Sequence, residues 1–75
     1  MKGWDAKRVG AQMRRCRVAG GYSRRTLAFE ARISMETVKH AELGRGDIRL
    51  ETLWRCADVL GVGLDEYVGR RTEHG

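Results

Sequence analysis

Apolar residues recur along this chain at the three- and four-residue spacing of amphipathic helices, in five segments. The first segment follows Asp5, a candidate N-cap, and runs to about Ala19, where two glycines end it. The remaining segments cover residues 24–31, 35–43, 50–60 and 64–68. Ser23 and Ser34 stand directly before the second and third segments, where a serine hydroxyl can accept a backbone N–H. The pattern therefore predicts five helices, no strands and an all-α fold.

Helices this short are unstable alone, so they must share one hydrophobic core. Trp54 flanks the inward stripe of the fourth helix and we expect it to be partly buried, whereas Phe29 and Val59 point outwards. Phe29 is either an interface residue or is covered by the segment that carries Trp4. Seventy-five residues suit a single domain, expected at 1–68, before a polar and flexible tail at 69–75. The predicted core consists of Val9, Met13, Cys16, Leu27, Ala28, Ala31, Ile33, Val38, Ala41, Leu53, Ala57, Leu60, Val62 and Leu64.

The chain is basic, and its charge is unevenly distributed. It has 15 Lys and Arg residues against 10 Asp and Glu, a formal net charge of +5. Residues 1–45 hold 11 basic and 4 acidic residues, whereas residues 46–75 hold 4 basic and 6 acidic ones. A basic front half suits a polyanionic partner, although a solvated basic surface would show the same composition.

The composition argues against several other function classes. No apolar run approaches the ~18 residues of a transmembrane helix and no signal peptide is visible, so we expect a cytoplasmic, nucleoid-associated protein without a membrane partner. Cys16 and Cys56 lack metal-ligand spacing and are interpreted as reduced core thiols, so no metal or other cofactor is predicted. His40 and His74 have no nucleophile or carboxylate arranged around them by any motif, so we predict that the protein is not an enzyme.

The predicted helix at 35–43 has a small apolar inner face and a mixed outer face that carries Met35, Glu36, Lys39 and His40. In the major groove of DNA, Lys39 could donate to guanine and Glu36 could accept from cytosine, while Met35 could touch a thymine methyl group. His40 could contact a base or a phosphate. An ordinary amphipathic helix with a solvated face would show the same division, so the flanking residues decide between the two interpretations.

Positions suited to DNA phosphates surround this helix. Two serines begin helices, whose N–H groups favour anions. Arginines open the second helix and flank the loop after the third, where phosphate contacts would hold the outer face in place. The candidate phosphate contacts are Ser23, Arg24, Arg25, Ser34, Arg45 and Arg49.

Several short motifs in register resemble the lambda-repressor-like, Cro/XRE-type helix-turn-helix family. They are Leu27-Ala28, Ile33-Ser34, Thr37-Val38, Glu42-Leu43-Gly44, the segment 50–53, Ala57, Leu60-Gly61-Val62 and Leu64-Asp65-Glu66. The resemblance covers about residues 9–68 and implies a compact five-helix domain in which the helix at 35–43 reads bases. It also implies that Ser23, Arg24 and Arg45 contact phosphates. Arg17 and Glu42 are similar to an ion pair of the family, which either places Arg17 near a phosphate or only stabilises the fold.

Four residues depart from the family pattern: Arg24, Arg32, and Met35 and Glu36, which replace the polar amides or hydroxyls often seen at the front of the third helix. Arg24 replaces a glutamine that usually begins the second helix, which favours a phosphate contact over a base contact. Arg32 stands in the turn where glycine is common, and a positive φ there would cost about 1 kcal/mol.

The sequence thus predicts a DNA-binding transcriptional regulator of the repressor, Cro-like switch or controller type. One such domain contacts few base pairs, so we expect a homodimer on an inverted-repeat operator in double-stranded DNA. The last helix offers Leu64, Tyr67 and Val68 as an interface, although Leu64 and Tyr67 would equally suit the core. The alternative function is a protein-interaction module, such as an antitoxin or adaptor, that binds its partner through Phe29.

Overall fold

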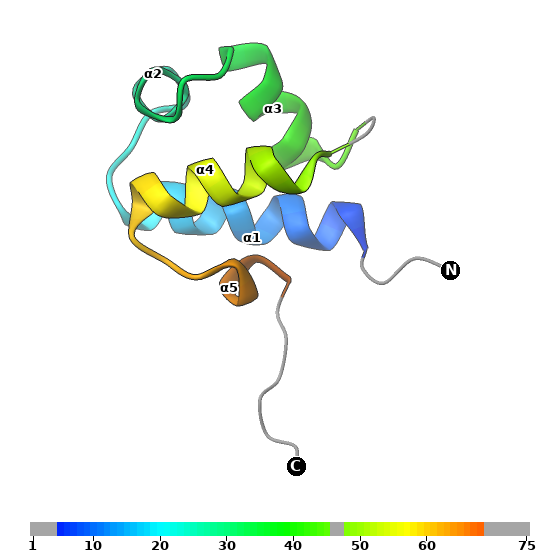
Figure 1. The fold of residues 1–75 in the computed structure, drawn as a ribbon. Coiled ribbons are helices and arrows are strands. Elements are labelled where there is room, and N and C mark those ends of the chain that lie inside the picture. Colours follow the sequence, from blue (N-terminus) through cyan, green and yellow to red (C-terminus); the bar gives the residue numbers. More distant parts are fainter. Residues whose placement is uncertain (1–4, 46–47, 69–75) are drawn as a thin grey trace.

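The computed structural model describes residues 5–45 and 48–68, and within them the chain forms five helices and no strand. They are α1 (Ala6–Ala19), α2 (Arg24–Ala31), α3 (Met35–Leu43), α4 (Leu50–Leu60) and α5 (Leu64–Val68). In Figure 1, α1 and α4 run together through the middle of the domain, with α2 and α3 on one side and α5 on the other. All five predicted helices are confirmed. Trp4, His74 and the predicted tail lie outside the described residues.

The helices begin where the predicted caps stand. Asp5 Oδ1 accepts the Lys7 N–H at 3.0 Å, and this bond satisfies one of the N–H groups that the first turn of α1 cannot pair internally. Ser23 Oγ and Ser34 Oγ do the same for α2 and α3, each accepting the N–H three residues later at 3.0 Å. These side-chain bonds fix the starts of the two helices that will form the site.

Most of the residues predicted for the core are buried in the structure. Nine predicted residues are buried, and five more pack around them half-buried. Cys56 and Tyr67 complete the core, each with no exposed surface. The buried predicted residues are Val9, Met13, Leu27, Ala28, Ala31, Val38, Ala41, Leu53 and Ala57, and the half-buried ones are Cys16, Ile33, Leu60, Val62 and Leu64.

Two predictions about α4 were wrong. Trp54 is 57% exposed, because Leu53, Cys56 and Ala57 fill the inward stripe and turn the neighbouring Trp54 towards solvent. Val59 was expected to point away, yet it is half-buried and packs against the core. Both errors concern positions beside the stripe, where the angle of the helix against its neighbours decides which side chain is covered.

One residue of the predicted interface on α5 needs correction. Tyr67 is completely buried, so its ring belongs to the core of a single chain and cannot cover a partner. Leu64 is half-buried against the same core. The side chain of Val68 lies outside the described residues. The short α5 therefore closes the core beneath α1, which was the second of the two roles considered for it.

Both cysteines are free thiols. Burial raises the pKa of the Cys56 thiol to about 12, and the nearby Glu42 carboxylate adds to this effect. Burial also raises the pKa of Cys16, with a further contribution from Glu66. Raised pKa values keep both thiols protonated near neutral pH, as suits core residues.

A glycine in α1 sets the distance between α1 and α3. Gly10 is buried, and a Cβ at this position would overlap the Ala41 carbonyl oxygen and stand 2.5 Å from that of Glu42. Only a residue without a side chain lets the two backbones approach so closely. This role of Gly10 is not visible in the sequence, because the contact joins residues more than thirty positions apart.

Candidate nucleic-acid interface

The turn between α2 and α3 has a defined hydrogen-bond pattern. The Ile33 N–H donates to the Ala28 carbonyl at 3.0 Å, and the Arg32 N–H donates to the Phe29 carbonyl at 3.3 Å. These two bonds form a Schellman motif, whose central residue is left-handed. Arg32 occupies that position with φ 61° and is the only non-glycine with a positive φ among the described residues. The turn thus sets α3 across α2 at the cost of a strained arginine.

The outer face of α3 is exposed as predicted. Val38 and Ala41 are buried, whereas Met35 is 48% exposed and Glu36, Lys39 and His40 are exposed. His40 Nε2 lies 3.8 Å from Glu36 Oε2, one helical turn away. The four predicted base-reading residues therefore share one solvent-facing surface that offers donors, an acceptor and a thioether.

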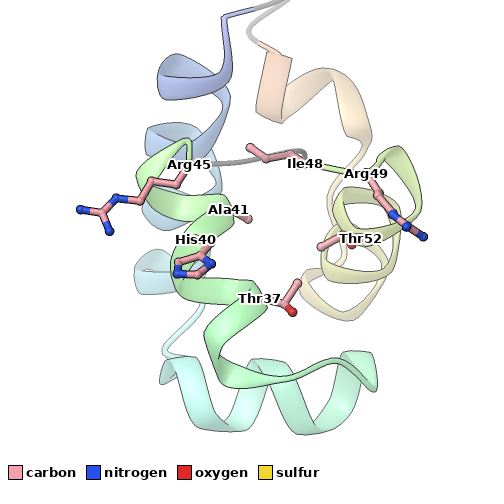
Figure 2. Close-up of a pocket in the computed structure, with 7 residues that line it drawn as sticks. All are labelled: Thr37, His40, Ala41, Arg45, Ile48, Arg49 and Thr52. Atoms are coloured by element: carbon pink, nitrogen blue, oxygen red, sulfur yellow. The ribbon is translucent and has the colours of Figure 1, made fainter.

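A cleft opens beside this face, between α3 and the start of α4. Its volume is about 170 Å³, below the ~300–1,000 Å³ of small-molecule sites. Figure 2 shows Thr37 on α3 and Thr52 on α4 bordering the cleft, while Arg45 and Arg49 extend away from it on opposite sides. His40 lies at the same border. The cleft thus adds hydroxyl, imidazole and guanidinium groups to the edge of the outer face of α3.

Two of the predicted phosphate contacts, Arg45 and Arg49, border the cleft beside α3. Arg25, Arg45 and Arg49 are exposed. Arg49 precedes α4 and provides no side-chain cap, so this helix begins without the hydroxyl that Ser23 and Ser34 give to α2 and α3. Those two hydroxyls are engaged as caps.

A buried ion-pair network lies behind α3. Arg17 Nε donates to Glu42 Oε2 at 2.5 Å, which confirms the predicted pair. Arg24 Nε donates to Glu42 Oε1 at 3.0 Å, a contact that the sequence analysis missed. Arg17 Nη1 also donates to the Tyr22 carbonyl at 2.8 Å. The network joins α1, the start of α2 and the last turn of α3.

Of the two roles considered for Arg17, the structure supports the one that stabilises the fold. The Arg17 side chain is only 10% exposed, and its guanidinium is bonded to Glu42 and the Tyr22 carbonyl. These bonds occupy three of the five N–H donors of the guanidinium. The contact of Arg17 with a phosphate stays a prediction.

The described residues contain no metal cluster and no membrane-spanning helix. No group of three His, Cys, Asp or Glu side chains in residues 5–45 and 48–68 is placed to hold a metal ion. None of the five helices combines the length and apolarity needed to cross a bilayer, within the part of the chain that the structure describes.

The five helices, with the outer face of α3 exposed and a tight turn joining α2 to α3, define a helix-turn-helix domain of the lambda-repressor-like type. A family model described as helix-turn-helix matches residues 13–67. The chain belongs to this helix-turn-helix family.

Relatives with known names agree with this assignment. The SPbeta prophage-derived HTH-type transcriptional regulator YonR of Bacillus subtilis (strain 168) is 30% identical over 56 residues. The alignment covers 75% of this chain and 52% of YonR, so the chain spans about half the length of that relative.

Solved structures share the fold over most of the chain. The restriction-modification controller protein C.AhdI from Aeromonas hydrophila superposes with a TM-score of 0.79 at 28% identity, covering 84% of this chain and 96% of that one. The clp gene regulator ClgR from Corynebacterium glutamicum gives a TM-score of 0.79 at 26% identity, covering 92% of this chain and 78% of that one.

Proposed function

We propose that this protein is a DNA-binding transcriptional regulator that reads operator half-sites in the major groove with α3. The observation that carries the proposal is the exposed polar face of α3, held outward by the buried Val38 and Ala41 and bordered by arginines. The names of the relatives, which include a transcriptional regulator, a controller protein and a gene regulator, support the same class. Such a role would place the protein on the nucleoid.

The outer face of α3 would supply the sequence specificity. Lys39 would donate to guanine O6 or N7, and Met35 would pack on a thymine methyl group. Glu36 would accept from cytosine N4, and it would repel phosphate wherever the wrong register brought it close. His40 lies within reach of Glu36 and would contact a base or a phosphate from the border of the cleft.

The flanking cationic groups would supply affinity without sequence preference. Arg25 at the start of α2 and Arg45 and Arg49 beside the cleft are exposed and would contact phosphates on either side of α3. Ser23 and Ser34 would contribute through the helix starts that they cap, where backbone N–H groups favour anions.

We further propose a homodimer whose two-fold contact lies on α4. Leu50 and Trp54, one turn apart on this helix, are 64% and 57% exposed. A groove beside Trp54 is bordered by two acidic and two basic residues, Glu30, Asp58, Arg32 and Arg55. In a two-fold dimer the same surface of each subunit faces that of the other. The acidic residues of one subunit can therefore pair with the basic residues of its partner. Two domains in this arrangement would occupy an inverted repeat.

Phe29 favours a second candidate function. This residue is 82% exposed on α2, which confirms the predicted outward position. An exposed aromatic residue of this size suits a protein partner, such as the toxin of an antitoxin or the target of an adaptor. Loss of partner capture in Phe29→Ser, with DNA binding unchanged, would establish this second function beside the first.

The salt dependence of DNA binding tests the proposed function. Affinity for a duplex of mixed sequence should fall linearly with salt on logarithmic axes, because bound phosphates release counterions. Arg49→Ala should reduce that slope by about one unit. Arg8→Ala, the matched control, removes the same charge from an exposed position on α1 outside the predicted contacts. Absence of salt-dependent binding by the wild-type protein would contradict the proposal, and equal effects of the two variants would reject the phosphate role of Arg49.

A further inference from the structure

We propose that Glu42 is a positioning residue, which holds Arg24 ready to bind a DNA phosphate and ties that phosphate anchor to α3. The inference rests on the proposed DNA binding and adds to it a role for a carboxylate that solvent does not reach. Glu42 lies in the last turn of α3, and its side chain has no exposed surface.

Two arginines share the Glu42 carboxylate unequally. Arg17 provides two bonds, from Nε at 2.5 Å and from Nη2 at 3.2 Å. The Nη1 of Arg17 donates to the Tyr22 carbonyl. Arg24 provides one bond, from Nε at 3.0 Å, and its side chain remains 35% exposed. Arg17 thus balances the charge of the carboxylate inside the domain. With Arg24 included, the network has two positive charges against one negative charge. The excess positive charge lies on Arg24, the more exposed of the two arginines.

The geometry of a guanidinium lets Arg24 serve two partners at once. Nε faces Glu42, and neither Nη1 nor Nη2 bonds to another group within residues 5–45 and 48–68. A planar guanidinium held by one edge can present its remaining donors to a phosphate. Because Glu42 already fixes the side chain, binding a phosphate would sacrifice little rotamer freedom.

The position of Arg24 at the start of α2 supports an anionic partner. Arg24 is the first residue of the helix, where backbone N–H groups have no intrahelical acceptor. Ser23 accepts the Thr26 N–H through its hydroxyl and the Leu27 N–H through its carbonyl. The N–H groups of Arg24 and Arg25 therefore remain for an anion beside the guanidinium.

Glu42 also connects this anchor to the outer face of α3. Lys39 lies three residues before Glu42 on the same helix, so one rigid turn separates the anchored guanidinium from a base-reading side chain. A phosphate bound at Arg24 would fix the position of α3 along the groove.

A double-mutant cycle tests this inference. Glu42→Gln, Arg24→Ala and the double variant are compared for binding of a fluorescent mixed-sequence duplex at fixed salt. Glu42→Gln makes the protein more positive, so charge alone predicts tighter binding. Positioning predicts instead that each single variant binds about tenfold more weakly, and that the double variant is no weaker than Arg24→Ala, because contacting residues are not additive. If Glu42→Gln weakens DNA binding by the same factor in the wild type and in Arg24→Ala, the role of Glu42 is merely structural and the inference is overturned.

A second variant covers the case in which Glu42→Gln does not fold. Arg24→Lys keeps the charge and leaves the Arg17–Glu42 pair intact, but a single ammonium group cannot hold a carboxylate and a phosphate in a fixed geometry. It should lose nearly as much affinity as Arg24→Ala. Arg14→Lys, an exposed change on α1, should bind as the wild type does. Wild-type affinity in Arg24→Lys would reject the positioning role, whereas absence of DNA binding by the wild-type protein would reject the proposed function itself.

Discussion

Replacing Gly10 with alanine should destabilise the domain, although alanine is the better helix former. Gly10 lies in the interior of α1, at its crossing with α3. The added Cβ would overlap the Ala41 carbonyl oxygen and stand 2.5 Å from the Glu42 carbonyl oxygen, where real contacts essentially never fall below 3.0 Å. Both obstacles are backbone atoms, so no side-chain rotation can relieve the overlap, and α1 and α3 must separate by at least about 0.5 Å.

The expected change in the free energy of unfolding of Gly10→Ala follows from two opposing effects. Alanine gains up to about 1 kcal/mol of helix propensity over glycine. Overpacking a tight contact costs about 1–3 kcal/mol, and a contact between two backbones belongs at the top of that range. The net loss should therefore be about 2 kcal/mol of the free energy of unfolding. For a domain of this size, that loss corresponds to a drop of roughly 8–16 °C in Tm.

Thermal unfolding followed by circular dichroism measures this change. Ala11→Gly is the matched control, because Ala11 is the exposed neighbour of Gly10 on the same helix. The control should lose about 1 kcal/mol through propensity alone. A Tm for Gly10→Ala at or above that of the wild type would refute the close approach of α1 and α3.

Three further predictions concern the turn, the core and α4. Arg32→Gly should raise Tm by a few degrees, since removing ~1 kcal/mol of left-handed strain outweighs the extra freedom of glycine in the unfolded chain; a lower Tm would contradict the strain. Folding raises the pKa of Cys56 from 9.0 to about 12, so its contribution to stability is complete below about pH 9 and is lost as the pH rises towards 12. The free energy of unfolding of Cys56→Ala, measured with urea, should therefore fall less steeply over this pH window than that of the wild type. Parallel curves for the two proteins would show that the Cys56 thiol does not cause the pH dependence. Trp54→Glu should convert the proposed dimer to a monomer in light scattering, whereas an unchanged mass would place the two-fold contact elsewhere.

Local signals in the sequence were sufficient to predict the helices. Ser23 and Ser34 form the caps that their positions predicted, and glycines end α3 and α4 in the left-handed conformation. The inner and outer faces of α3 followed from helical periodicity alone. Each of these features depends on residues a few positions apart, which a sequence displays directly.

Features that join distant parts of the chain were harder to predict. Periodicity places Trp54 and Val59 beside the inward stripe, but the packing of α4 against α1 and α2 decides which of them is covered. The Arg24–Glu42 contact spans 18 positions, and Gly10 faces carbonyls on another helix. The sequence allowed Tyr67 to lie either at an interface or in the core, and the packing of α5 against α1 places it in the core.

Selection from a random duplex library at about physiological salt shows directly whether α3 reads bases, because non-specific phosphate binding is already weakened there. We expect the wild-type protein to enrich an inverted repeat. Lys39→Ala should lose roughly 1–3 kcal/mol of binding free energy on that site and relax the choice of base at one position. Failure to enrich any sequence, with binding that fades uniformly as salt rises, would contradict base reading by α3 and favour a protein partner instead.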